Sequence, residues 1–149
     1  NSAFVKDEAE EKGADEGIVL NSQGKVAEGS GCNLFVVRDG VLITPPINSD
    51  ILEGITRRTI LQLAQEMEIP TEVRAIDRTE LYLLDEAFFC GTGVQVAWIE
   101  SIDGRPVGNK QRGPIAAKLQ DAFFNIVRGR DPQHAQFLTK VRAKAGAAV

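Results

Sequence analysis

Apolar and polar positions alternate in short runs over the first third of the chain. Runs of apolar and β-branched residues at 18–20, 34–37 and 41–43 are separated by Gly-containing turns. Such runs predict hairpin strands, and the Asp-Gly pair at 39–40 is a strong turn signal. We therefore expect a β-meander here, preceded by a surface helix over 3–12.

The later part of the chain mixes helical and strand patterns. Apolar residues between Ile60 and Met67 follow the spacing i, i+3, i+4, i+7, which predicts a helix over 55–68. A second apolar stripe, with Pro114 at the first helical position, predicts a helix over 113–128. Further strands are expected at 71–76, 87–90 and 94–102, and a short helix at 78–84.

Composition places the chain among globular proteins. It has 149 residues, 43% of them hydrophobic, and a net charge of −4 from 17 Lys plus Arg and 21 Asp plus Glu. These values predict one domain, and the acidic balance argues against nucleic acid as a partner. No apolar run is long enough to span a bilayer, so we expect a cytoplasmic protein without membrane contact. Residues 141–149 are expected to be a frayed tail.

Cysteine and histidine offer little chemistry. Cys32 and Cys90 could form at most one bridge, and they match no Cys/His metal spacing, so no metal site is expected. The single histidine, His134, lies in a polar stretch with no Ser or Cys motif near it. It is expected to be a solvated surface residue, which argues against Ser-His or Cys-His nucleophilic catalysis.

Three segments join glycine to polar groups at the boundaries of elements. Glu28 and Asn33 flank flexible glycines between two strands, where a ligand can approach the backbone closely. At 52–58 a loop gives way to a helix whose free N–H groups, together with the Thr56 hydroxyl, suit a phosphate. At 90–95 a Gly-Thr-Gly turn can offer amide N–H groups to an anion.

Each segment also fits a purely structural role. The first could be a sharp turn with a solvated Glu28, the second a helix start with Arg57 and Arg58 exposed, and the third a β-bulge. Together, the three segments favour a pocket for an anionic small molecule.

The order of these motifs resembles the class IV, or fold-type IV, pyridoxal-phosphate aminotransferases, and most of all the branched-chain amino-acid aminotransferases. The family pattern runs Glu-x-x-x-x-Asn-apolar-Phe, Thr-Pro, apolar-x-Gly-Ile-Thr-Arg, Gly-Thr and Ile-Asp-Gly-Arg. The matching positions in this chain are 28–35, 44–46, 52–57, 91–92 and 102–105. The resemblance extends over 1–140.

The resemblance implies an α/β fold, an irregular barrel-like mixed sheet flanked by helices. This is the large, C-terminal domain of enzymes that are similar to D-amino-acid aminotransferase. The smaller N-terminal domain, with its phosphate-binding Arg, is expected to be absent from the chain. The family's Schiff-base lysine aligns before Asn1. The 149 residues alone are therefore expected to be inactive.

The resemblance also assigns residues to the cofactor, pyridoxal 5′-phosphate. It implies that Glu28 bonds the pyridine nitrogen and keeps it protonated, so that the ring can accept electrons. Gly31 would line the ring, and Leu52 would pack against it. The remaining implied residues are Ile55, Thr56 and Thr92 for the phosphate, and Thr92, Gly93 and Val94 for the substrate carboxylate.

The implied activity is a transaminase that moves an amino group between branched-chain amino acids (Leu, Ile, Val) and 2-oxoglutarate, in a homodimer or higher homo-oligomer. Cys32 stands where the family commonly has an acidic residue, and Trp98 stands where it commonly has Pro. These departures leave substrate choice open, so a D-amino-acid aminotransferase or an aminodeoxychorismate lyase remains an alternative. A non-catalytic domain that binds a phosphorylated ligand also stays open, because the lysine is missing.

Overall fold

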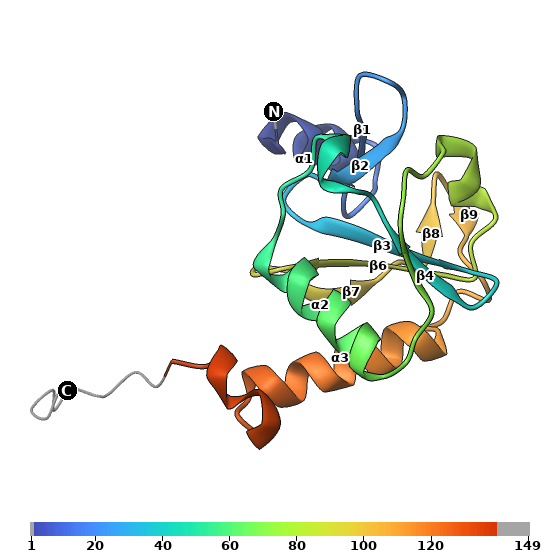
Figure 1. Cartoon of the computed structure of the whole chain (residues 1–149). Helices are drawn as coiled ribbons and strands as arrows, with labels where there is room; N and C mark the ends of the chain where they lie inside the picture. The colour runs from blue at the N-terminus through green and yellow to red at the C-terminus, as the bar shows by residue number, and fades with distance from the viewer. Residues whose placement is uncertain (1, 140–149) are drawn as a thin grey trace, which may run out of the picture.

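The computed structural model describes residues 2–139, and its elements form layers around a central sheet (Figure 1). The helices are α1 (Ser2–Glu11), α2 (Ile55–Glu66) and α3 (Pro114–Val127). The strands are β1 (Ile18–Leu20), β2 (Val26–Gly29), β3 (Asn33–Arg38), β4 (Val41–Thr44), β5 (Thr71–Val73), β6 (Glu86–Gly91), β7 (Gln95–Trp98), β8 (Ser101–Ile102) and β9 (Arg105–Pro106). Short 3₁₀ helices are η1 (Ile47–Ser49), η2 (Arg78–Tyr82) and η3 (Pro132–Phe137).

The central sheet has five strands in the order β5-β4-β3-β6-β7. Only the β4–β5 pair is parallel, and the other three pairs are antiparallel. Strand β3 lies in the middle and is buried on both faces, which is why its sequence is a continuous apolar run from Leu34 to Val37.

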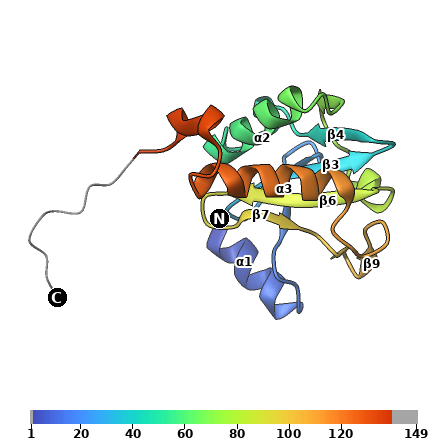
Figure 2. The same ribbon diagram turned by 90° about the horizontal axis from the view of Figure 1, so that it is seen from below.

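One face of this sheet is covered by α2 and α3, as the view from below shows (Figure 2). Phe35 of β3 and Phe88 of β6 stack there with ring centroids 5.2 Å apart. The apolar stripe of α3, including Leu119 and Ile126, packs into the same core. Both predicted helices are thus confirmed within two residues at their ends.

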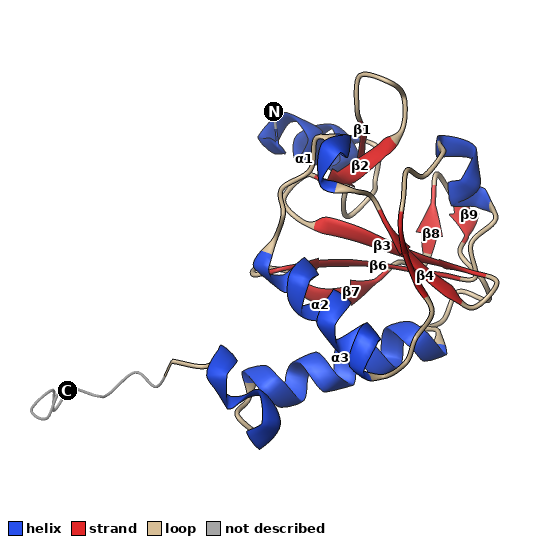
Figure 3. Cartoon of the chain, viewed as in Figure 1, coloured by secondary structure: helices blue, strands red, loops and turns tan. Residues whose placement is uncertain are grey.

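The opposite face is covered by smaller pieces: the β1–β2 ribbon, η2 and the β8–β9 ribbon (Figure 3). Leu34 and Val36 of β3 point into this second core, which also takes Val26 of β2 and Leu81 of η2. The two cores are separated by the sheet, because successive side chains of a strand point to opposite faces.

The predicted mixed sheet with flanking helices is confirmed, but no closed barrel forms among residues 2–139. The predicted meander instead divides into two sheets, β1–β2 and the sheet that contains β3–β4. The N–H of Val26 in β2 donates to the carbonyl of Ile76, 3.0 Å away. This edge of β2 therefore bonds to the segment after β5 and not to β3.

Three other expected elements are shorter than predicted. The strand expected over 71–76 is β5, which covers only Thr71–Val73. The strand expected over 94–102 is divided into two: β7 ends at Trp98, and the chain then enters the separate β8–β9 ribbon, whose hairpin turn consists of Asp103 and Gly104, both at positive φ. The helix expected over 78–84 is the 3₁₀ helix η2.

The expectation of a solvated His134 is wrong. Its side chain is buried, with Nδ1 2.7 Å from Oδ2 of Asp131 and Nε2 2.8 Å from Oε2 of Glu66, and its ring stacks on Phe137. It ties η3 to the C-terminal end of α2. The carboxylate of Glu66 lies 68 positions away in the sequence, so local polarity gave no sign of the contact.

Across residues 2–139, none of the helices is long and apolar enough to cross a membrane. The tail expected at 141–149 lies outside the described residues.

Candidate functional site

The Glu28 carboxylate is the meeting point of two of the three predicted segments. Glu28 lies in β2, and its Oε2 accepts hydrogen bonds from Nδ2 of Asn33 and from the backbone N–H of Leu52, both at 3.0 Å. The Asn33 amide also donates to the Leu52 carbonyl at 2.8 Å. The end of β2, the start of β3 and the loop before α2 are thereby joined at one side chain.

The environment of Glu28 suits a carboxylate that pairs with a bound cation. Burial raises the pKa of the Glu28 carboxyl, and the Leu52 N–H opposes that rise because it favours the ionised form. Within residues 2–139 no hydrogen bond reaches Oε1. One oxygen is therefore held by the protein and the other is left for a partner.

The start of α2 is open. Gly54 precedes it with φ 63°, no side chain caps it, and the first helical hydrogen bond runs from the Arg58 N–H to the Gly54 carbonyl at 3.1 Å. The N–H groups of Ile55 and Thr56 come before that bond and lie at the positive end of the helix dipole. A Cβ at Gly54 would collide with Oδ1 of Asn33, so only glycine fits.

Arg57 is buried rather than exposed, unlike Arg58. Its Nε donates to Oγ1 of Thr44 at 3.3 Å and its Nη2 to the carbonyl of Pro45 at 2.8 Å. Burial lowers the pKa of the guanidinium, which still keeps its charge. In the described part of the chain no carboxylate lies within ion-pair distance of it, so its charge adds to the positive potential at the start of α2.

The third predicted segment is the turn between β6 and β7. Thr92, Gly93 and Val94 form its exposed tip, and a Cβ placed on the preceding Gly91 would lie 3.5 Å from the carbonyl oxygen of Gly31. This turn therefore packs beside the loop between β2 and β3, which brings the third segment to the first.

The structure thus gathers the predicted residues along one end of the sheet. Glu28 and Leu52 are hydrogen-bonded, Gly31 lies beside the 91–94 turn, and Ile55 and Thr56 follow the glycine that contacts Asn33. Three apolar side chains between η1 and the start of α2 project outward: Ile47, Leu52 and Ile55 are 54%, 73% and 68% exposed.

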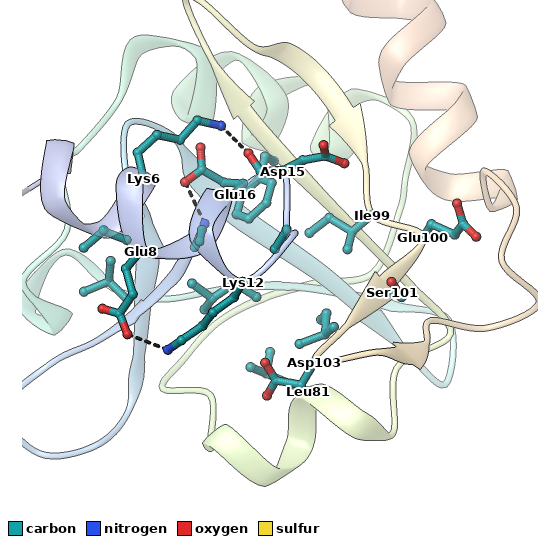
Figure 4. Close-up of a pocket in the computed structure, with 18 of the residues that line it drawn as sticks. Lys6, Glu8, Lys12, Asp15, Glu16, Leu81, Ile99, Glu100, Ser101 and Asp103 are labelled. Carbon is teal, nitrogen blue, oxygen red and sulfur yellow. Dashed lines mark hydrogen bonds and ion pairs between the residues drawn. The ribbon is translucent and has the colours of Figure 1, made fainter.

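A wide groove elsewhere on the surface touches this site at one residue, Val94. It lies between α1 with the loop that follows and the β7–β9 region (Figure 4). Two lysines of the groove are engaged with neighbours: Lys6 bonds the Asp15 carbonyl, and Lys12 pairs with Glu8. Neither lysine is therefore available to the site.

The two cysteines take no part in this chemistry as nucleophiles. Cys32 packs in one core and Cys90 in the other, on opposite faces of the sheet, and both are free thiols. Burial raises the pKa of Cys32 to about 11 and that of Cys90 to about 12, so both stay protonated at neutral pH.

Comparison with known proteins identifies the family. Residues 1–102 match the family model described as amino-transferase class IV. The chain belongs to the class IV aminotransferase family. It is 48% identical over 145 residues to the probable branched-chain-amino-acid aminotransferase of Aquifex aeolicus, covering 97% of this chain and 47% of that protein. The class IV chain thus spans about half the length of the curated relatives it matches.

Solved structures of class IV aminotransferases share the fold. The branched-chain aminotransferase of Thermoproteus uzoniensis, crystallised with norvaline, has a TM-score of 0.89 at 47% identity, covering 93% of this chain and 46% of its own. The enzyme of Thermobaculum terrenum, solved in its pyridoxal-phosphate form, has a TM-score of 0.90 at 46% identity, covering 93% and 45%.

Asn33 is the site residue to which the sequence gave no role of its own. Its place in the Glu-x-x-x-x-Asn motif was the available signal, but its partners, Leu52 and Gly54, come from another part of this class IV aminotransferase chain. Three lysines of the described residues are engaged away from the site: Lys6 and Lys12 at the groove, and Lys25 with Asp77.

Proposed function

We propose that this chain forms the pyridoxal-phosphate side of a transaminase that exchanges amino groups between branched-chain amino acids and 2-oxoglutarate. The observation that carries the proposal is the position of Glu28, with one oxygen fixed and one free, beside the uncapped start of α2. A cationic ring nitrogen and a phosphate are the complementary groups. The names of the relatives support the choice of amino acid.

The described residues fit the cofactor. Gly31 and Gly93 have nothing within 4 Å where a Cβ would stand, which leaves room for a ring and a substrate next to the backbone. Bound pyridoxal phosphate supplies an electron sink for the substrate's α-carbon. Glu28 Oε1 would hold the proton on the ring nitrogen, because the ion pair lies in a partly buried place.

The phosphate would lie at the start of α2. The N–H groups of Ile55 and Thr56 and the Thr56 hydroxyl would donate to its oxygens, and the buried Arg57 would strengthen the local potential. Thr92 would donate a further hydroxyl from the 91–94 turn. The N–H groups of Gly93 and Val94 would receive the substrate carboxylate.

Several properties of the whole protein belong to the same proposal. Its partners are amino acids and 2-oxo acids, it assembles as a homodimer or larger homo-oligomer, and it works in the cytoplasm. The exposed apolar side chains of Ile47, Leu52 and Ile55 favour assembly, because such side chains gain from being covered.

The test is an assay of the gene-encoded protein with L-leucine and 2-oxoglutarate, with D-alanine and aminodeoxychorismate in parallel. We expect turnover with the branched-chain substrate, whereas preference for either of the others selects the corresponding enzyme on the same fold. Cofactor binding without turnover on any substrate would select the non-catalytic alternative. The 149-residue chain alone is expected to show no turnover, since Lys6, Lys12 and Lys25 are all engaged with other groups.

Glu28→Gln tests the central residue. Cofactor binding should remain measurable, because the phosphate contacts are intact, while turnover should fall by about 100-fold or more as the ring proton loses its ionic partner. In the gene-encoded protein, fluorescence titration with pyridoxal phosphate measures the binding, and steady-state kinetics with L-leucine and 2-oxoglutarate measures the turnover. Unchanged turnover would refute the role given to Glu28.

A further inference from the structure

We propose that Asn33 is a positioning residue: its amide orients the Glu28 carboxylate and ties it to the turn that begins α2. The inference rests on the proposed function, in which Glu28 holds the ring nitrogen. Asn33 is the first residue of β3 and is only 4% exposed. A buried amide at the end of a strand keeps its place only if its hydrogen bonds are satisfied.

Both donors of the amide group are engaged. Nδ2 of Asn33 lies 3.0 Å from Oε2 of Glu28 and 2.8 Å from the carbonyl oxygen of Leu52. The N–H of Leu52 donates to the same Oε2 at 3.0 Å. Asn33, Leu52 and the carboxylate therefore close a ring of three hydrogen bonds, which fixes the plane in which Oε1 is presented.

The oxygen of the Asn33 amide, Oδ1, faces the backbone of Gly54. Oδ1 lies so close to the Gly54 backbone that a Cβ there would collide with it. If the amide were turned over, its oxygen would face Oε2 of Glu28 and the Leu52 carbonyl, and both acceptors would lose the hydrogen bond from Nδ2. Only one orientation of Asn33 satisfies every contact.

No other side chain of this size serves these contacts. Leucine has the right bulk but no donor, and aspartate would place a second negative charge about 3 Å from Glu28. Because Gly54 immediately precedes α2, the same amide sets the spacing between the Glu28 carboxylate and the N–H groups of Ile55 and Thr56. Asn33 thus couples the ring-nitrogen partner to the phosphate-binding helix start.

The first test measures the Glu28 carboxyl by ¹³C NMR in the unmodified chain and in Asn33→Asp. In the unmodified chain, the side-chain amide signals of Asn33 should titrate together with the Glu28 carboxyl, since they share a hydrogen bond. Asn33→Asp should raise the pKa of Glu28 by about one pH unit or more. Asn125→Asp, the same change at an exposed position of α3, should leave it unchanged.

The second test measures binding of pyridoxamine 5′-phosphate to the gene-encoded protein by calorimetry. Asn33→Asp should weaken binding about tenfold or more, and the loss should depend on pH because Glu28 and the new carboxylate titrate together. Asn33→Leu, which adds no charge, should weaken binding without that added pH dependence.

The outcomes separate the two proposals. Side-chain amide signals of Asn33 that do not follow the titration of Glu28 in the unmodified chain would overturn the positioning role. An unaltered pKa of Glu28 in a folded Asn33→Asp variant would overturn it as well. These readings need no cofactor, and the first needs no variant. Failure of the gene-encoded protein to bind pyridoxamine 5′-phosphate would instead overturn the proposed function while the joint titration still decides the role of Asn33.

Discussion

The starts of α2 and α3 look alike in sequence but are completed differently in space. Each helix is preceded by a glycine, Gly54 or Gly113, and neither glycine provides a side-chain cap. At α3, the Glu86 carboxylate from β6 accepts the N–H of Ile115 at 3.1 Å and of Ala116 at 2.7 Å. At α2, the described residues provide no side-chain acceptor for the N–H groups of Ile55 and Thr56.

This contrast separates a structural anion site from a ligand site. Glu86 is buried, and a Cβ at Gly113 would collide with its carboxyl group, so the glycine makes room for an internal anion. At α2 the glycine makes room for the Asn33 amide instead, and the helix N–H groups stay available. The fold fills one positive helix end with its own carboxylate and leaves the other for a bound anion.

The largest expected effect comes from removing the Glu86 carboxylate that caps the start of α3. Glu86→Ala would leave the N–H groups of Ile115 and Ala116 buried without an acceptor and should lower the free energy of unfolding by about 3 kcal/mol. Urea denaturation measures this loss. Glu53→Ala, an exposed carboxylate beside α2, is the control and should cost less than about 0.5 kcal/mol. Equal costs for the two variants would contradict the contrast.

The next effect comes from crowding the open helix start. Gly54→Ala should lower the free energy of unfolding by about 2 kcal/mol, because alanine is strained at φ 63° and its Cβ meets Asn33. Gly24→Ala is a matched control, since Gly24 has φ 74° but nothing within 4 Å. Thermal denaturation of both variants isolates the contact with Asn33. If the two losses are the same, the close approach contributes nothing.

A smaller effect concerns ligand affinity. Thr56→Ala in the gene-encoded protein should weaken pyridoxal-phosphate binding by about 1 kcal/mol, or about fivefold, the scale of one typical hydrogen bond. Thr59→Ala in the same helix, whose hydroxyl donates to the Ile55 carbonyl, should leave the affinity unchanged. Fluorescence titration compares them. A loss in both variants would place the effect in the helix rather than in the site.

The smallest effect is expected at the C-terminal end of α2, where the His134 side chain joins Glu66 of α2 to Asp131. The hydrogen bond to Asp131, followed by that to Glu66, raises the pKa of His134 above its ordinary value. The stability this adds is complete below the unfolded pKa of about 6.5 and is lost as pH rises through the higher folded pKa. The pKa values of Asp131 and Glu66 are lowered, chiefly by His134 and Gln62 respectively, so their contribution is lost as pH falls through those values.

Thermal midpoints of the unmodified chain and of His134→Gln, measured from about pH 5 to about pH 9, test this. The midpoints should differ most on the acidic side of this range and converge as the imidazole loses its proton. A difference that is constant across the range would show that the ring acts by packing on Phe137 alone.

Much of the fold could be predicted because it depends on local patterns. The 3.6-residue period predicted α2 and α3, and the apolar run from Leu34 to Val37 predicted a strand, although not its central place in the sheet. The β1–β2 and β3–β4 hairpins were also predictable, but their assignment to separate sheets was not. It depends on the bond from Val26 to Ile76, which lies 50 positions further along the chain, so that no local signal points to it.

The predicted site was partly accessible for the same reason. Glycine next to polar residues marks places where backbone is open, and this pointed to the loop after Glu28, the start of α2 and the 91–94 turn. The burial of Arg57, the ion pairs of His134 and the cap from Glu86 were not accessible, because each depends on a partner from a distant element.

The sequence alone determined which groups are present and where the chain can be helical, extended or open. It placed Glu28, Asn33 and Thr56 at element boundaries, and its motif order indicated the family. Only the tertiary structure decided which of these groups meet: which oxygen of Glu28 is held, which helix end is filled by Glu86, and which stays free. The physical reason is that backbone propensity is local, whereas a buried polar group must find its hydrogen-bond partner wherever the fold brings one.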